Sequence, residues 1–479
     1  MKIKQSYILM SLAFVSGMVL MIFELVAARL LAPSIGSSTY IWTSVIGVII
    51  AMLAIGVWLG GRLADRRNVF EDVALLLLAV AFSVTLVINF STVILELLSR
   101  SSTDPRLKGV IASLLLFAPT SFLIGTIGPY LAKLNVRELS HTGRSVASID
   151  AMNAIGGIFG TFLTGFVLFS FIGSRNILIL LVIILLLVSW TVRPRQKVKP
   201  RLALSVVIVM LTFMSPDLVR DIHIDTATAH YVISDQEMYS TTIRLIKTGP
   251  GGFQSGIDTS DPDYLFFWYS KEIADVVEKL AQKDHILVLG GGAYTLPRYL
   301  ADKYPKSQID VVEIDPELIE IAQKYFYYNN RENIENISDD ARSYVDTTNR
   351  KYDLVVVDIY NDTEVPFTVL TKEYGQSIRR VVESGGTVIA NIIAGENDSC
   401  DDFLRASLKP YLDNFSFGAY QNYDEKRAMA NIVAVFGESK LDLGENYKSA
   451  LAPNAPVYTD DFSPAEALQF GCSSYSRQV

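Results

Sequence analysis

The distribution of charged residues divides the chain into two parts with different hydrophobic patterns. In the first 216 residues, long runs contain no Asp, Glu, Lys or Arg. A helix that crosses the hydrocarbon core of a membrane needs roughly 20 apolar residues. The runs therefore predict six spans and leave a seventh, shorter one in doubt. They are Gln5–Phe23, Leu30–Gly61, Val73–Leu95, Gly109–Ala132, Ala151–Ser174, Asn176–Val192 and, as the doubtful one, Leu202–Pro216.

After residue 220 the apolar runs become short and their period changes. Residues 220–262 alternate polar and apolar side chains between glycine-rich turns, which predicts a small antiparallel β unit. From residue 285 onward, short apolar strands alternate with helices in βαβ order, which is typical of a doubly wound, Rossmann-like parallel sheet. We therefore predict an α-helical transmembrane domain at 1–219, the β unit at 220–262 and an α/β domain at 263–479.

Composition and charge support this division. Half of the chain is hydrophobic and only 19% is charged, against about 25% in ordinary soluble domains. This composition argues against a disordered chain and against a nucleic-acid-binding protein. Residues 1–216 carry 18 Lys and Arg against 8 Asp and Glu, whereas the remaining residues carry 24 against 42. We expect a basic half in the lipid bilayer of the cell membrane and an acidic half outside the bilayer.

The short loops between the spans predict an orientation. Lys and Arg accumulate in the cytoplasmic loops of membrane proteins. The loops on the side of the N-terminus carry 13 of them and the opposite loops four, which places the N-terminus in the cytoplasm. Six spans return the acidic half to the cytoplasm, and seven place it outside. The 15 residues of Leu202–Pro216 would rise about 22 Å, less than about 30 Å of hydrocarbon. We therefore expect a cytoplasmic acidic half.

Glycines and acids follow the predicted strands of the α/β part. Gly290 and Gly292 lie directly after the first strand, and Glu313 ends the second. Asp340 and Asp358 follow the third and the fourth. Such sheets bind ligands at the carboxyl ends of their strands, where glycines admit a ligand and an acid accepts hydrogen bonds from ribose hydroxyls. The pattern predicts a nucleoside site. The alternatives are acids that only cap helices and a hydride-transfer enzyme, although the third glycine of the dinucleotide pattern is absent.

Four segments of this part resemble the spermidine synthase family, whose sheet is shared with class I S-adenosylmethionine-dependent methyltransferases. They are Ile286–Gly292, Val311–Pro316, Asp339–Arg342 and Tyr352–Asp358. The apolar half is similar to the multi-span region of membrane proteins fused to a spermidine synthase-like domain. The resemblance implies a transferase that uses decarboxylated S-adenosylmethionine or S-adenosylmethionine as co-substrate.

The resemblance also implies roles in the nucleoside site. Glu313 would hold the ribose of decarboxylated S-adenosylmethionine. Asp340 would meet the adenine amino group, with Ala341 beside it. Gly290 and Gly292 would pass under the nucleoside.

On the acceptor side the chain departs from the family pattern. Asp358 matches the first acid of the family's catalytic loop, and Tyr269 lies where the family places a substrate-gate tyrosine. Ala293 replaces the aspartate that grips the aminopropyl amine. Asn361 replaces the second acid of the loop and would contact the substrate, and Asp362 follows it. Because the attacking amine must be deprotonated, we expect Asp358 and Asp362 to be catalytic.

Three functions fit these residues. The first is a membrane-anchored aminopropyltransferase that acts on a cationic polyamine such as putrescine, which the acidic half would attract. The second is a methyltransferase on the same scaffold, which Ala293 and Asn361 favour. The third is a non-catalytic transporter or sensor that binds a nucleoside or a polyamine, which Glu24 and Asp150, in or near the spans, favour.

Several other residues are expected to have no chemical role. The four histidines form no i,i+3 or i,i+4 ligand pair, so we expect no metal site. Cys400 and Cys472 have no paired spacing, so we expect no disulfide. Gly156 and Gly160 in the predicted fifth span are four residues apart, a spacing that lets two helices approach closely.

Overall fold

The computed structural model describes most of the chain and divides it into two compact units, Met1–Tyr231 and Val232–Val479. The boundary falls within strand β2. The described residues are 2–66, 70–99, 101, 104–136, 142–192, 198–213, 221–238, 241–249, 252–359, 366–396, 400–423, 429–452 and 455–475.

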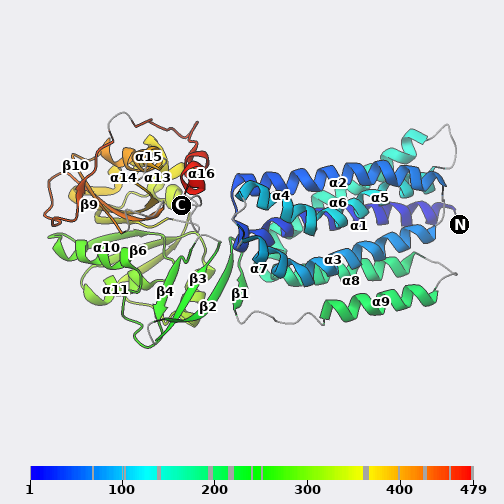
Figure 1. The fold of residues 1–479 in the computed structure, drawn as a ribbon, viewed down its shortest axis with the longest axis horizontal. Helices are drawn as coiled ribbons and strands as arrows, with labels where there is room; N and C mark the ends of the chain where they lie inside the picture. Colours follow the sequence, from blue (N-terminus) through cyan, green and yellow to red (C-terminus); the bar gives the residue numbers. More distant parts are fainter. Residues whose placement is uncertain are drawn as a thin grey trace. The chain divides into compact units, whose positions relative to one another are not determined.

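The first unit is a bundle whose helices lie side by side (Figure 1). Five helices among the described residues are long and apolar enough to cross a membrane. The pair α4–α5, bent by 54°, would be a sixth span. The elements are α1 (Lys2–Ile35), α2 (Thr39–Arg66), α3 (Phe70–Ser99), α4 (Pro105–Leu116), α5 (Ala118–Asn135), α6 (Thr142–Leu163), the π-helix η2 (Thr164–Leu168), α7 (Phe169–Phe171), α8 (Ser174–Thr191) and α9 (Val198–Phe213).

Helices α1 and α6 pack at very short range through glycines. A Cβ atom added to Gly156 would lie 1.9 Å from the carbonyl oxygen of Phe14, and one added to Gly160 would lie 2.6 Å from that of Met18. Only glycine leaves room for the opposing backbone at these positions, as small residues do at close helix crossings in membranes. The predicted packing role of both glycines is confirmed.

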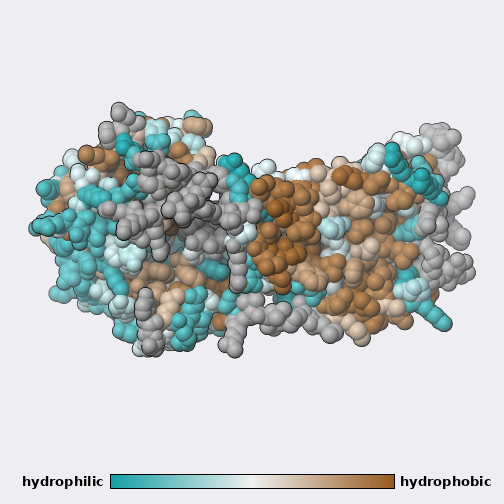
Figure 2. Space-filling model, viewed as in Figure 1, coloured by the Kyte–Doolittle hydropathy of each residue, from teal (hydrophilic) through white to brown (hydrophobic). Residues whose placement is uncertain are grey.

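The outer surface of the bundle is apolar. Figure 2 shows the visible face of this unit covered mainly by hydrophobic residues. Large apolar side chains such as Trp58, Phe90, Phe162 and Phe166 are more than half exposed there. Soluble monomers rarely expose contiguous apolar patches above a few hundred Å², so this surface fits a hydrocarbon environment.

Two sheets follow. The first has four strands in the order β1-β2-β3-β4, and β2, β3 and β4 pair in antiparallel fashion, which is the predicted small β unit. The second sheet has eight strands in the order β12-β10-β11-β9-β8-β5-β6-β7. The strands are β1 (Ile222–Asp225), β2 (His230–Met238), β3 (Thr241–Lys247), β4 (Ser255–Asp258), β5 (His285–Leu289), β6 (Gln308–Glu313), β7 (Ile334–Ser338), β8 (Tyr352–Val357), β9 (Val382–Ala394), β10 (Phe417–Asn422), β11 (Ala430–Gly437) and β12 (Lys448–Ser449).

Helices cover both faces of the eight-stranded sheet, so the predicted Rossmann-like fold is confirmed. Helices α13, α14 and α15 pack on one face, and α10, α11 and α12 pack on the other. Alternate residues of each strand point to opposite faces, and the buried strand residues divide between the two cores in this way. The helices are α10 (Trp268–Lys279), α11 (Thr295–Lys303), α12 (Glu317–Tyr325), α13 (Ala341–Thr347), the 3-10 helix η3 (Phe367–Leu370), α14 (Lys372–Val381), α15 (Asp401–Leu412) and α16 (Ala465–Tyr475).

The sheet is mixed rather than wholly parallel. Strands β7, β6, β5, β8 and β9 are parallel, as expected. Strands β11, β10 and β12 extend the β9 edge in antiparallel fashion. The βαβ repeat in the sequence reaches only as far as β9, so it does not predict this extension.

The expectation of unpaired cysteines is wrong. Cys400 precedes α15 and Cys472 lies in α16, and the two form a disulfide. Their Cα atoms are 4.5 Å apart although 72 residues separate them in the sequence. Because the pairing depends on how α16 packs near the start of α15, the spacing alone gave no sign of it.

Candidate active site

The turn after β5 requires glycine at two positions. Gly290 has a φ of +95° and Gly292 a φ of +51°, values that suit glycine best. A Cβ atom on Gly290 would lie 2.2 Å from the carbonyl oxygen of Asp358, and one on Gly292 would lie 2.7 Å from Ser255 Oγ. The turn therefore lies directly against the residue that ends β8 and against the start of β4.

Glu313 holds this turn from the end of the neighbouring strand β6. Its carboxylate accepts hydrogen bonds from the backbone N–H of Gly291 at 2.8 Å and of Asp315 at 3.0 Å. The side chain is buried, and burial raises the pKa of Glu313. The predicted proximity of the acid and the glycines is thus present, and the carboxylate is fixed beside the turn.

Asp340 lies at the next strand end but already has a structural role. It is the N-cap of α13 and accepts a hydrogen bond from the backbone N–H of Ser343 at 2.9 Å. Asp340 is exposed, whereas Ala341 is buried. The capping alternative therefore applies to Asp340, and its exposed position also leaves it accessible to a ligand.

Asp358 is the centre of a small polar cluster. Asn391 Nδ2, in the last part of β9, donates a hydrogen bond to Asp358 Oδ1 at 2.8 Å. The hydroxyl of Tyr269 donates to the carbonyl oxygen of Gln254 at 3.3 Å and lies near Asp358. Burial raises the pKa of Asp358 to about 6, although the neighbouring Asn391 and Tyr269 side chains lower it. Burial and Asp358 together raise the pKa of Tyr269, so Tyr269 keeps its proton and acts as a donor.

The structure adds polar groups that the sequence reasoning missed. Buried side-chain atoms without a hydrogen-bond partner among the described residues include Gln254 Oε1, Asn391 Oδ1 and the hydroxyl of Tyr294. Buried polar atoms are nearly always paired, so this set fits a polar ligand near the glycine turn. The signal for Asn391 was available, because it is the one amide in an otherwise apolar part of β9.

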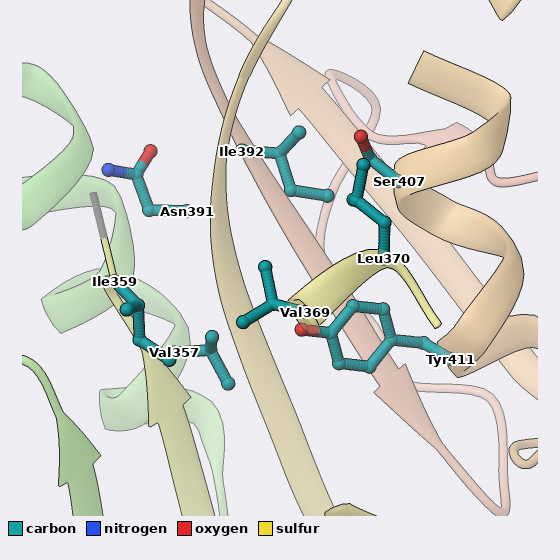
Figure 3. Close-up of a pocket in the computed structure, with 8 residues that line it drawn as sticks. All are labelled: Val357, Ile359, Val369, Leu370, Asn391, Ile392, Ser407 and Tyr411. Atoms are coloured by element: carbon teal, nitrogen blue, oxygen red, sulfur yellow. The ribbon is translucent and has the colours of Figure 1, made fainter. Parts of the chain in front are cut away.

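A small pocket lies beside the cluster (Figure 3). Asn391 and Ile392 contribute from β9, Val369 and Leu370 from η3, and Tyr411 from α15. Figure 3 shows Asn391 and Ile392 on opposite sides of their strand, with the Tyr411 ring close to Val369. The remaining lining residues are Val357, Ile359 and Ser407. The predicted Asn361 and Asp362 lie outside the described residues.

Comparison with known proteins identifies the family. Residues 266–396 match the spermine/spermidine synthase domain. A polyamine aminopropyltransferase of Vibrio vulnificus is 34% identical in an alignment of 211 positions that covers 39% of this chain and 70% of that protein. The chain belongs to the polyamine aminopropyltransferase family. The domain that contains the matched residues 266–396, called the aminopropyltransferase domain below, is therefore that of a transferase enzyme.

More distant relatives include methyltransferases. The human eEF1A lysine and N-terminal methyltransferase is 26% identical in an alignment of 136 positions that covers 26% of this chain and 19% of that protein. Among solved structures, a probable spermidine synthase from Corynebacterium glutamicum is similar at 24% identity and a TM-score of 0.42, over 49% of this chain and 95% of that one. No group of three or more His, Cys, Asp or Glu that could hold a metal ion occurs within the described part of the chain.

Proposed function

We propose that this protein is a membrane-anchored polyamine aminopropyltransferase. Its donor is decarboxylated S-adenosylmethionine, and its acceptor is a cationic amine such as putrescine. The observation that carries the proposal is the cluster of Asp358, Asn391 and Tyr269 at the strand ends, next to the glycine turn. A carboxylate with a pKa of about 6 is ionised at neutral pH and is close enough to the working pH to accept a proton.

The nucleoside half of the proposal uses the turn and Glu313. A ligand would pass over Gly290 and Gly292, and Glu313 would accept hydrogen bonds from the ribose hydroxyls. Each Glu313 oxygen already accepts one backbone hydrogen bond, and a carboxylate has about four acceptor sites, so acceptor capacity remains. Asp340 would contact the adenine amino group, with Ala341 beside it.

The transfer step needs only a base and correct positioning. The acceptor amine loses a proton to the carboxylate of Asp358, directly or through Asp362. The amine lone pair then attacks the methylene carbon of the aminopropyl group, and the carbon–sulfur bond breaks. The electron pair of that bond returns to sulfur, which converts the sulfonium donor into a neutral thioether nucleoside. Tyr269, which stays protonated, and Asn361 would orient the acceptor.

Anchoring in the membrane rests on the first unit. Its five long apolar helices, and the bent pair as a sixth span, would bring the enzyme to the bilayer. The exposed aromatic and aliphatic side chains of the bundle support this assignment. Resistance of the protein to extraction by alkaline carbonate would test it.

Turnover by the full chain in detergent tests the function. The protein is incubated with decarboxylated S-adenosylmethionine and putrescine, and methylthioadenosine and spermidine are quantified. Both products should appear in equal amounts, and Asp358→Asn should lower kcat by about 10²-fold or more with little change in donor affinity. Absence of both products with a correctly folded protein would refute the proposal.

One observation favours a methyltransferase as the second candidate. Ala293, which replaces the family's amine-gripping acid, is buried, and its N–H donates to Ser255 Oγ at 3.1 Å. The site therefore lacks a carboxylate at this position to hold the aminopropyl ammonium group. The same assay with S-adenosylmethionine and a mixture of amine acceptors separates the two candidates, because methyl transfer yields S-adenosylhomocysteine.

A further inference from the structure

The helix bundle of the first unit has two ends, and α9 begins at the end where α8 terminates. Trp190 Nε1, in the last turn of α8, donates a hydrogen bond to Ser205 Oγ at 3.3 Å. Arg201, in the first turns of α9, is buried, lies over the Trp190 ring at 4.9 Å and donates to the carbonyl oxygen of Ser189. The two helices therefore form a tight hairpin at this end.

From there α9 runs along the bundle. The hydroxyl groups of Thr212 and Thr85 are 3.0 Å apart and buried, and Thr85 lies near the midpoint of α3. Asn89 Nδ2, one turn further along α3, donates to the carbonyl oxygen of Leu211 at 3.2 Å. These contacts exclude a helix that lies flat across the end of the bundle.

The chain that follows α9 is found at the opposite end. Asp225 accepts hydrogen bonds from the backbone N–H of Ser174 at 2.8 Å and from its hydroxyl at 3.0 Å. Ser174 is the first residue of α8. Arg29, near the end of α1, donates to the carbonyl oxygens of Thr226, at 2.6 Å, and Ala227. The chain has thus returned along the whole of α8, whose 18 residues rise about 27 Å, close to the thickness of the hydrocarbon.

The end at which α9 begins is the basic one. The start of α1 and the end of α5 lie together at one end of the bundle, because Ser6 Oγ donates to Asn135 Oδ1 at 2.9 Å. Lys133 Nζ, near Asn135, donates to the carbonyl oxygen of Ala64 near the end of α2. The loops with 13 Lys and Arg connect at this end, which is therefore cytoplasmic. Asp225 lies at the other end, outside the cytoplasm.

The second unit must begin on the same side as Asp225. Thr226 and Val232 are six residues apart, and six residues reach at most about 21 Å, too little to recross about 30 Å of hydrocarbon. The described helices after this point, α10 to α16, have 12 residues or fewer, far short of the roughly 20 residues of a span.

The disulfide points independently to the same compartment. Cys400 and Cys472 are the only cysteines of the chain, both belong to the second unit, and they are joined and fully buried. Disulfides form and persist in oxidising compartments and are rare in the reducing cytoplasm.

We infer that the aminopropyltransferase domain works outside the cytoplasm, in an oxidising compartment, and takes both its nucleoside donor and its amine acceptor from there. This inference rests on the membrane anchoring of the proposed function and reverses the sequence-based expectation of a cytoplasmic domain. It requires that a sulfonium nucleoside be present on that side of the membrane, supplied by export or from outside the cell.

Cysteine labelling in intact cells tests the sidedness. Ser439→Cys, on an exposed position of the domain, should react with a membrane-impermeant maleimide without lysis. The matched control Asp65→Cys, exposed at the basic end, should react only after lysis. The native disulfide stays in place in both variants, because its sulfurs do not react with maleimide. Labelling of Ser439→Cys only after lysis would overturn the inference, and so would labelling of both variants in cells whose cytoplasmic proteins remain unlabelled.

Thiol trapping tests the compartment without any mutation. Wild-type cells are quenched in acid, and the denatured protein is treated with a maleimide–polyethylene glycol reagent. The two cysteines should react only after reduction, giving a double mobility shift. Two free thiols in the quenched protein would contradict an oxidising location.

Failure of the proposed function remains distinguishable from failure of the inference. If the detergent-purified enzyme shows no turnover but Ser439→Cys is labelled from outside, the activity is wrong and the sidedness stands. If turnover is observed but labelling needs lysis, the activity stands and the sidedness is wrong.

Discussion

Replacing Asn391 gives the sharpest test of the proposed base. Its amide donates a 2.8 Å hydrogen bond to Asp358 Oδ1, and this bond lowers the pKa of Asp358, which burial raises to about 6. The bond stabilises the ionised carboxylate, so removing it favours the protonated form and raises the pKa of Asp358 further. Asn391→Leu removes the donor and keeps the same number and branching of side-chain heavy atoms.

The size of the shift follows from the strength of the bond. A hydrogen bond to a charged group contributes about 1.5–3 kcal/mol, and about 1.4 kcal/mol corresponds to one pKa unit. The pKa of Asp358 should therefore rise by about one to two units, to about 7–8. At pH 7 the ionised fraction would fall from about 0.9 to between about 0.5 and 0.1. Because the base must be ionised, kcat/KM at pH 7 should fall about two- to tenfold and recover at about pH 9.

The assay is the pH profile of kcat/KM for aminopropyl transfer, measured on the full chain in detergent between about pH 5 and pH 9. Wild-type activity should rise with pH through about 6, the pKa of Asp358. Asn330→Ala removes an exposed amide side chain that accepts a hydrogen bond from Gln323 at 3.0 Å. It serves as the matched control and should keep that profile. An unchanged inflection near pH 6 in Asn391→Leu would refute the reasoning. A loss that persists at high pH would instead assign Asn391 a packing role.

Three further predictions use pairs of positions or the nucleoside site. Glu313→Ala should weaken nucleoside binding, measured by calorimetry, about tenfold to a hundredfold, because a charged acceptor worth about 1.5–3 kcal/mol is lost. Circular dichroism should show that the variant is folded. An unchanged Kd would remove Glu313 from the site. Gly290 and Gly444 share a φ of +95°, but a Cβ atom meets nothing within 4 Å at Gly444. Gly290→Ala should therefore lower Tm and nucleoside affinity well beyond Gly444→Ala, and equal effects would show that only backbone strain matters. In the bundle, Gly156→Ala should lower the Tm of the detergent-solubilised protein. Gly165→Ala should not, because a Cβ atom at Gly165 meets nothing within 4 Å. Similar Tm values for the two variants would contradict the close packing of α1 and α6.

The parallel part of the sheet was predictable because its strands are buried on both faces. Such strands are continuous apolar runs, and the runs His285–Leu289 and Tyr352–Val357, which predict strands, are the observed bounds of β5 and β8. The acids and glycines at their ends were predictable for the same reason, since parallel strands end at one edge. The antiparallel strands β10 to β12 follow α15 and lack the βαβ repeat, so the same rule gave no information there.

The polar cluster at Asp358 was only half predictable. The strand order places β8 next to β9, and an amide inside the apolar β9 was a usable signal for Asn391. Tyr269 comes from α10, which precedes the sheet, and its contact with Asp358 depends on how that helix packs. Tertiary packing determines which groups surround a buried ionisable residue. It therefore also determines the direction in which the pKa of that residue shifts.

The doubtful seventh span shows why a charge-free run gives the wrong bounds for a helix. The run was taken to begin at Leu202, but α9 begins at Val198 and ends at Phe213 among the described residues. Arg201 interrupts the run in the sequence, yet in the structure its guanidinium lies over the Trp190 ring and donates to a carbonyl oxygen of α8. A charge that is paired within the bundle does not need to reach the membrane surface. The 16 residues of α9 rise about 24 Å, and the rule that excluded Arg201 left out the first four of them. Because one span changes the side of everything that follows, the inferred location of the enzyme domain depends on how this single buried arginine is accommodated.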